Sequence, residues 1–152
     1  MSLLSSGTHA GLVFELLSGE TLFDPQSPRA GERFSKDESH LAQAVELLGA
    51  LPQDLAKRGA RSAKWFSPPE TPGHATLRNI AIQAPPRDVD ALARVLEENF
   101  GFARKDSREI SAFLKELLEY EPAKRLSATD ALKLPWLQHT AQPHDYSEGD
   151  AL

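Results

Sequence analysis

The segment from 106 to 122, "DSREISAFLKELLEYEP", carries the feature that most restricts the fold. Its apolar residues recur three or four positions apart: Ile110, Phe113, Leu114, Leu117 and Leu118. This spacing places them on one face of an α-helix, which then has to be buried against other elements. Pro122 cannot continue the helix because it lacks the amide donor and its ring clashes with the preceding turn. The segment therefore predicts a long helix packed in the interior.

Helical spacing also appears elsewhere, whereas strand alternation is nearly absent. Further helices are expected at roughly 3–17, 38–48 and 88–101, with short ones at 52–59 and 127–134. The first of these looks buried, and the section 60–86 reads as irregular because prolines and glycines interrupt it. We therefore expect a mainly α chain with irregular helical packing.

Capping patterns define some of the expected helix ends. Ser35 and Glu38 have the spacing of a capping box, and Gly49 follows the last apolar residue of that helix. Asp106 and Glu109 repeat the cap spacing, so Asp106 is the expected N-cap of the longest helix. Ser127 is the expected N-cap of the last short helix.

Charge and composition exclude several classes of function. The 152 residues carry a net charge of -5 and contain no cysteine. An acidic chain is a poor general ligand for nucleic acid, so a basic partner is expected instead. The absence of cysteine excludes disulfides and thiolate metal sites. The start, "MSLLSSGTHAGLVFELLSG", has neither a basic first region nor enough apolar length to span a bilayer, which predicts no membrane association.

No motif for catalysis or cofactor binding stands out. The chain lacks G-x-G-x-x-G, G-x-x-x-x-G-K-[ST], H-E-x-x-H and G-x-S-x-G, and its histidines stand alone. We therefore assign no catalytic, cofactor-binding or metal-binding residue from the sequence.

Acidic residues gather in the loop and helix between 20 and 46. They are Glu20, Asp24, Glu32, Asp37, Glu38 and Glu46. Two interpretations fit this cluster. The carboxylates cap the helix, whose positive N-terminal dipole favours them, and otherwise face solvent. Alternatively, they form a surface that captures Arg-rich peptide segments.

Arg125 lies in "EPAKRLSATDALKLPWL", between the end of one expected helix and the start of the next. It is either solvated or partly buried, where its planar guanidinium holds a carboxylate or backbone carbonyls. Trp136 completes the apolar face of the short helix that follows.

These stretches together show a resemblance. "VFELLSGETLFDP", "KDESHLAQAVELLGALPQDLAKRGARSAKWF", "LRNI" and "FLKELLEYEPAKRLSATDALKLPWL" resemble the C-terminal lobe of a eukaryotic Ser/Thr protein kinase, and most of all the SR-protein kinase branch. The last motif, P-x-K-R-x-S-A-x-x-x-L-x-x-P-W, is quite specific to protein kinases. The resemblance implies a lower C-lobe portion of the kinase-like fold at 11–137, with a divergent start at 1–10. The segment 138–152 shows no periodicity and is expected to be a disordered tail.

The resemblance also implies a function. The family phosphorylates Arg-Ser-rich proteins of mRNA processing with ATP and Mg²⁺, but the Gly-rich loop, H-R-D, D-F-G and A-P-E motifs are absent from these residues. The chain alone is therefore expected to be inactive, with no cofactor of its own and a second kinase half as one expected partner. A docking module for basic Arg-Ser-rich segments, or a truncated product without function, are the alternatives. Cytoplasmic and partly nuclear localisation is what the family implies.

Individual roles follow from the same resemblance. Glu20 and Glu46 match acidic positions of the family's docking groove, and Asp37 and Glu38 adjoin Ser39, which stands where a third carboxylate is usual. Arg125 matches the arginine that pairs with the glutamate of A-P-E. Since that glutamate is absent here, we expect Arg125 to turn to solvent or to bind a local carboxylate or carbonyls.

Overall fold

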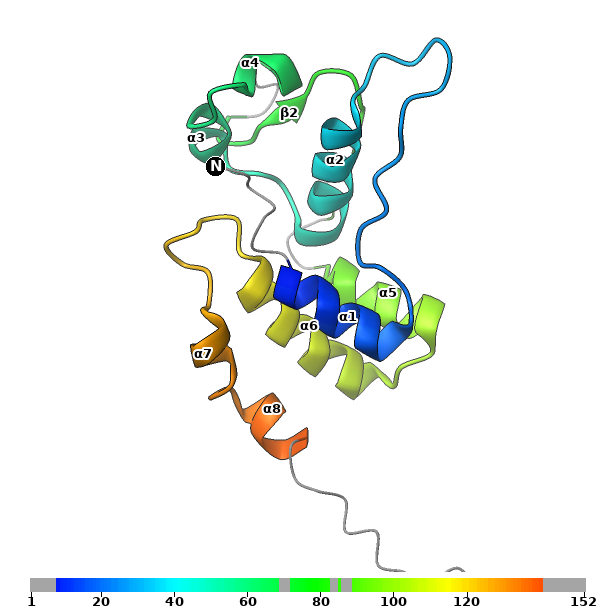
Figure 1. The fold of residues 1–152 in the computed structure, drawn as a ribbon, viewed down its shortest axis with the longest axis vertical. Coiled ribbons are helices and arrows are strands. Elements are labelled where there is room, and N and C mark those ends of the chain that lie inside the picture. The colour runs from blue at the N-terminus through cyan, green and yellow to red at the C-terminus, as the bar shows by residue number, and fades with distance from the viewer. Residues whose placement is uncertain (1–7, 69–71, 83–84, 86–88, 141–152) are drawn as a thin grey trace, which may run out of the picture.

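The computed structural model of the protein describes residues 8–68, 72–82, 85 and 89–140 (Figure 1). The elements follow in chain order: α1 (Thr8–Ser18), α2 (Lys36–Leu48), α3 (Gln53–Lys57), α4 (Ser62–Trp65), β1 (Phe66–Ser67), β2 (Thr76–Leu77), α5 (Ala91–Phe100), α6 (Arg104–Leu118), α7 (Ala128–Ala131) and α8 (Pro135–Thr140). The described part of the chain is thus mainly helical, as the sequence predicts.

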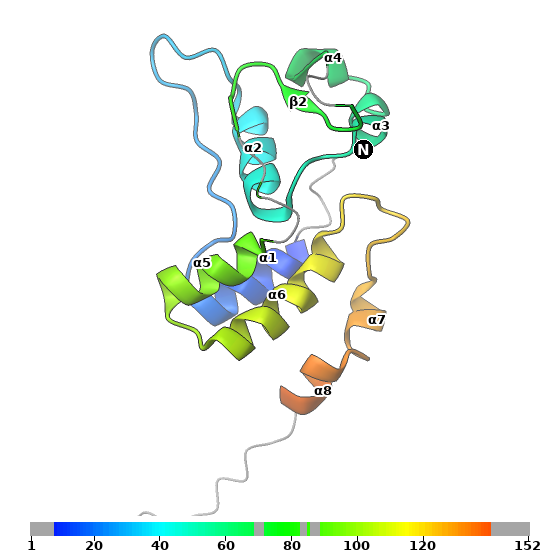
Figure 2. The same ribbon diagram turned by 180° about the vertical axis from the view of Figure 1, so that it is seen from behind.

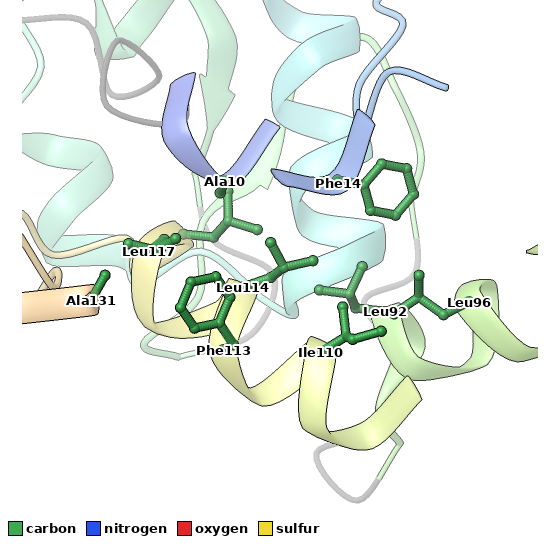
Figure 3. Close-up of a cluster of buried hydrophobic side chains, with 10 residues drawn as sticks. Ala10, Phe14, Leu92, Leu96, Ile110, Phe113, Leu114, Leu117 and Ala131 are labelled. Carbon is green, nitrogen blue, oxygen red and sulfur yellow. The ribbon is translucent and has the colours of Figure 1, made fainter. Parts of the chain in front are cut away.

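The main hydrophobic core lies between α1, α5 and α6 (Figure 3). The stripe of α6 supplies half of its buried residues, and every residue of the predicted stripe is buried. Leu92 and Leu96 of α5 face Leu114 of α6, and these three side chains have no exposed surface. Phe14 of α1 meets Phe100 edge-to-face, with 5.6 Å between the ring centroids. The predicted packing of the longest helix against other helices is therefore confirmed.

A second, smaller unit holds α2, α3, α4 and a short hairpin (Figure 2). β1 and β2 pair antiparallel, with Phe66 opposite Leu77. Two small apolar clusters form beneath them, one around Leu51 and Leu55 and the other around Leu41 and Leu77. Contacts between α2 and α5 join this unit to the main core. The region predicted as irregular therefore contains one helical turn and a two-stranded hairpin.

Most helix ends follow the predicted caps. The Ser35 hydroxyl accepts a hydrogen bond from the Glu38 amide at 3.2 Å. Gly49 ends α2 with a φ of 95°, a conformation that glycine adopts without strain. Ser127 caps α7. The expected start of α6 at Asp106 is wrong, because the helix begins at Arg104. Asp106 instead lies in the first turn, where its carboxylate faces the positive end of the helix dipole.

α1 is buried on one face only. Ala10 and Phe14 are buried in the core, but Leu12 is 54% exposed and Leu16 is 77% exposed. The expectation of a buried helix is therefore wrong for the opposite face, because no described residue covers it. Residues 3–7 of the expected helix lie outside the described residues.

The C-terminal elements α7 and α8 run down one side of α6 (Figure 1). The Trp136 ring packs on Phe113 with 4.7 Å between the centroids, so α8 is held against the core. α8 continues to Thr140, three residues into the range expected as a disordered tail, while 141–152 lie outside the described residues. Among the described helices, none is long and apolar enough to cross a membrane.

Candidate docking site

The long loop that follows α1 lies along α2 in the opposite direction (Figure 1). The Asp24 amide donates to Gln43 Oε1 at 3.0 Å, and Gln43 Nε2 donates to the Asp24 carbonyl at 2.8 Å. One helical turn earlier, the Gln26 amide donates to Ser39 Oγ at 3.0 Å. We call this contact between Asp24–Gln26 and the Ser39–Gln43 face of α2 the loop–helix seam. It fixes the loop backbone beside the helix.

Glu20 precedes Asp24 by four residues in the same loop, and Glu46 lies on α2. Both residues are exposed, and neither carboxylate has a hydrogen-bond or ion-pair partner within the described ranges. Glu46 follows Gln43 by three positions, so it projects from the same side of α2 as the seam. Asp24 is exposed as well, and among the described residues its carboxylate accepts a hydrogen bond only from Gln26 Nε2, at 2.8 Å. These three carboxylates are available to a cationic ligand.

Glu38 lies in the interior and not on this surface. Its side chain is 1% exposed. One carboxylate oxygen accepts the Asn79 amide at 2.7 Å and the other accepts Asn79 Nδ2 at 3.0 Å. Both oxygens are therefore occupied by the segment that follows β2. The assignment of Glu38 to an exposed docking surface is not supported by this geometry, because a peptide cannot reach the carboxylate.

Asp37 is exposed, but it projects from the other side of α2. An α-helix turns by about 100° per residue, and the nine positions from Asp37 to Glu46 bring the two side chains to opposite sides. The structure therefore does not bring the four predicted docking carboxylates together on one surface. It leaves Glu46 on the seam side of α2 and Glu20 exposed in the loop before the seam, and it adds Asp24, which the sequence placed only in the wider acidic cluster.

His40 packs the loop onto α2 from the adjacent face. Its ring lies 5.0 Å from that of Phe23, and Nε2 is buried without a hydrogen-bond partner in the described part of the chain. Burial lowers the pKa of His40, and the nearby Asp37 carboxylate opposes that shift. The imidazole is consequently neutral near pH 7, which makes it part of the apolar packing under the loop.

Arg125 and Trp136 have structural positions. Arg125 Nε donates to the Glu119 carbonyl at 2.9 Å, so the guanidinium binds the C-terminal end of α6. Binding of a backbone carbonyl is one of the arrangements that the sequence predicts for Arg125. Trp136 packs on Phe113, as described above. Both residues therefore tie the last two helices to α6.

No cluster of three or more metal-ligating side chains occurs in the described ranges.

The sequence did not predict the partner of Glu38. Asn79 is distant in the chain, and only the "LRNI" stretch of the resemblance marked its position.

Known proteins similar to this chain are protein kinases. Over 132 residues it is 36% identical to the Ser/Thr-protein kinase SKY1 of Saccharomyces cerevisiae, a match that covers 86% of this chain and 16% of SKY1. It is 39% identical over 128 residues to SRSF protein kinase 3 of Mus musculus, covering 84% of this chain and 20% of the relative. The chain is therefore similar to a C-terminal part of SR-protein-kinase-like Ser/Thr protein kinases. The Ser/Thr-protein kinase SRPK of Physarum polycephalum is 34% identical over 128 residues, covering 84% of this chain and 28% of the relative.

The match to the SR-protein kinase family concerns a part of each relative. This chain spans between 16% and 28% of the lengths of these three kinases. Together with the helical fold, the match corresponds to a fragment of the C-lobe of an SR-protein-kinase-like enzyme. A scan against models of protein families found no match.

Proposed function

We propose that this chain is the part of an SR-protein kinase that docks basic, Arg-Ser-rich peptide segments at the loop–helix seam. The observation that supports this most strongly is the position of Glu20 and Glu46. Both carboxylates are exposed beside a loop whose backbone is fixed on α2 by Gln43 and Ser39. A fixed scaffold lowers the ordering cost when a long Arg side chain binds.

The family relationship suggests the class of ligand. One relative is named SRSF protein kinase 3, and the resemblance to this family implies a ligand rich in Arg and Ser. Arg presents a planar set of donors that matches a carboxylate, so alternating Arg residues suit a row of separated acidic side chains. Glu20, Asp24 and Glu46 would supply that row.

Localisation in the cytoplasm and nucleus stays a prediction.

Phosphoryl transfer itself is proposed to require residues beyond this sequence. The reaction depends on positioning and neutralising the phosphates of ATP, which the Gly-rich loop, the D-F-G aspartate and the H-R-D aspartate perform in kinases. These motifs do not occur in the 152 residues. We therefore expect the isolated chain to bind an Arg-Ser peptide without phosphorylating it. Turnover in a radiolabelled ATP assay would contradict this part of the proposal.

Docking is tested by titrating the chain with a fluorescent peptide of repeated Arg-Ser pairs. Each exposed ion pair is worth about 0.2–1 kcal/mol, so two lost carboxylates should weaken binding by roughly 2- to 30-fold. The test variant is Glu20→Gln together with Glu46→Gln. Binding should also weaken with added salt, because exposed charges are screened.

The matched control is Glu15→Gln together with Glu116→Gln. Both residues are exposed, on α1 and α6, and their replacement changes the net charge by the same amount. The control should retain nearly full affinity. If both double variants lose affinity equally, the peptide responds to net charge only, and the seam is not the docking site.

A second candidate, a truncated product without its own function, is favoured by the uncovered face of α1. Leu12 and Leu16 are exposed there, and apolar patches of this kind promote association or aggregation. Size-exclusion chromatography with thermal melting separates the two candidates. A soluble monomer with a cooperative transition supports the docking module, whereas aggregation at all concentrations supports the truncated product.

A further inference from the structure

Basic residues gather in a patch on α3, α4 and the end of the hairpin. These elements lie on the other side of α2 from the long loop (Figure 2). Four of the eight residues from 57 to 64 are Lys or Arg and none is acidic. The patch consists of Lys57, Arg58, Arg61, Lys64 and Arg78, which are all exposed. Such a concentration of positive charge is unexpected in a chain with a net charge of -5. The acidic seam does not account for it.

A pocket of about 330 Å³ opens within the basic patch, between α3, α4 and the hairpin. Ala56, Phe66 and Ala75 contribute to its apolar wall, and Gln53, Lys57 and Arg78 contribute polar groups. None of the described residues that line it is acidic. The pocket therefore combines two cations with an apolar surface, which suits a ligand that carries an anion beside an apolar group.

The chain fixes one of these cations in place. Arg78 Nη2 donates to the carbonyls of Ala63 and Phe66, at 3.0 Å each, so the guanidinium is held at the end of α4. The next residue, Asn79, is held by the buried Glu38 carboxylate. Lys57 has no ion-pair partner among the described residues, whereas Arg58 pairs with Glu121 at 2.9 Å. Lys57 and Arg78 are thus the cations that face the pocket.

We propose that this pocket binds a short acidic peptide segment. A carboxylate of the segment lies between Lys57 and Arg78, and a neighbouring apolar side chain packs on Phe66 and Ala75. The site is independent of the proposed docking function, because its ligand has the opposite charge and a different part of the chain binds it. The SR-protein kinase chain then carries two peptide sites of opposite charge preference.

The shape of the site favours a peptide over RNA. RNA binding needs cations that track several phosphates, and the acidic surface elsewhere on the chain repels a polyanion. A pocket of this volume with an apolar wall instead accepts one or two side chains. A peptide whose acidic residues are flanked by apolar ones matches both features.

In the test, the isotopically labelled chain is titrated with the peptide Leu-Asp-Glu-Leu, acetylated at its N-terminus and amidated at its C-terminus like the control peptide, and amide NMR spectra are recorded. We expect saturable shifts at the amides of the pocket, including Lys57, Ala63 and Ala75. Lys57→Gln removes one cation and Ala63→Glu places an anion at the rim, and each should weaken binding by at least about threefold. Neither residue is buried, so both variants should fold.

Lys124→Gln is the matched control, because Lys124 is exposed outside the patch and the change removes the same charge. It should leave the affinity unchanged. Equal binding of the neutral peptide Leu-Asn-Gln-Leu, or equal losses in Lys57→Gln and Lys124→Gln, would overturn the proposal. A short single-stranded RNA that shifts the same amides at lower concentration would overturn the choice of a peptide ligand.

Discussion

The buried carboxylate of Glu38 offers the sharpest test of how α2 is attached to the hairpin. In a Glu38→Ala variant the partly buried Asn79 amide loses its acceptor, which costs about 1–3 kcal/mol. Asn79 Nδ2 can turn toward water because Asn79 is exposed, so losing its hydrogen bond to Glu38 adds only about 0.5–1.5 kcal/mol. The variant also no longer buries the charge of the Glu38 carboxylate, and this offsets part of the lost stability. We expect a net loss of about 2–3 kcal/mol in the free energy of unfolding.

Two further variants separate hydrogen bonding from packing. Glu38→Gln keeps the volume and one acceptor for the Asn79 amide, but its own amide group then faces Nδ2, and we expect a loss of about 1 kcal/mol. Combining Glu38→Gln with Asn79→Asp restores a donor and acceptor pair. This double variant should regain most of the lost stability.

Urea unfolding followed by circular dichroism measures these differences, and Asp37→Ala is the control. Asp37 is exposed in the same turn, so its loss should cost only about 0.5 kcal/mol through the helix dipole. For a chain of this size, Glu38→Ala should lower Tm by roughly 4–12 °C. Equal effects of Glu38→Ala and Asp37→Ala, or no recovery in the Glu38→Gln, Asn79→Asp pair, would refute the reasoning.

His40 and Asp90 give two further predictions. Burial depresses the pKa of His40 in the folded state, so the unfolded chain binds its proton first, and the stability from the neutral ring falls as pH drops below the ordinary value of 6.5. The free energy of unfolding, measured with urea at about pH 7.5 and 5.5, should therefore fall less between these pH values in His40→Gln than in the control His9→Gln, whose ring is exposed. Equal decreases in the two variants would contradict this. The Asp90 carboxylate accepts the Ala93 amide at 3.0 Å, Ser111 Oγ at 2.7 Å and Lys115 Nζ at 2.7 Å. Asp90→Ala should therefore lower the free energy of unfolding by about 2 kcal/mol, and Asp90→Asn, whose side chain still caps α5, by about half as much. Equal free energies of unfolding for the two variants would contradict this.

The helical architecture was predictable because its signals are local. The spacing of apolar residues in α6 and the Ser35 cap depend on neighbours within one or two turns. The start of α6 was less predictable, since a cap without a side-chain hydrogen bond leaves no signal in the sequence. Similarly, nothing in α1 distinguishes Phe14, which is buried, from Leu16, which is exposed. That difference depends on which other elements cover the helix.

The docking residues show the same limit. Asp37 and Glu38 are adjacent acidic residues in the first turn of α2, yet one is exposed and the other is buried. The difference comes from Asn79, 41 residues further along the chain, whose donors satisfy the Glu38 carboxylate. The seam likewise depends on Gln43 and Ser39, which sequence alone does not distinguish from other polar residues. Long-range partners of this kind decide which carboxylates remain available.

The position of a bound Arg-Ser peptide tests the central claim most directly. Amide NMR spectra of the labelled chain, recorded during titration with the repeated Arg-Ser peptide, locate the contact. We predict shifts at Glu20, Asp24 and Glu46 that saturate together and weaken with salt, with no comparable shifts in the basic patch. Shifts centred on Asp37, or spread evenly over all exposed carboxylates, would contradict docking at the loop–helix seam.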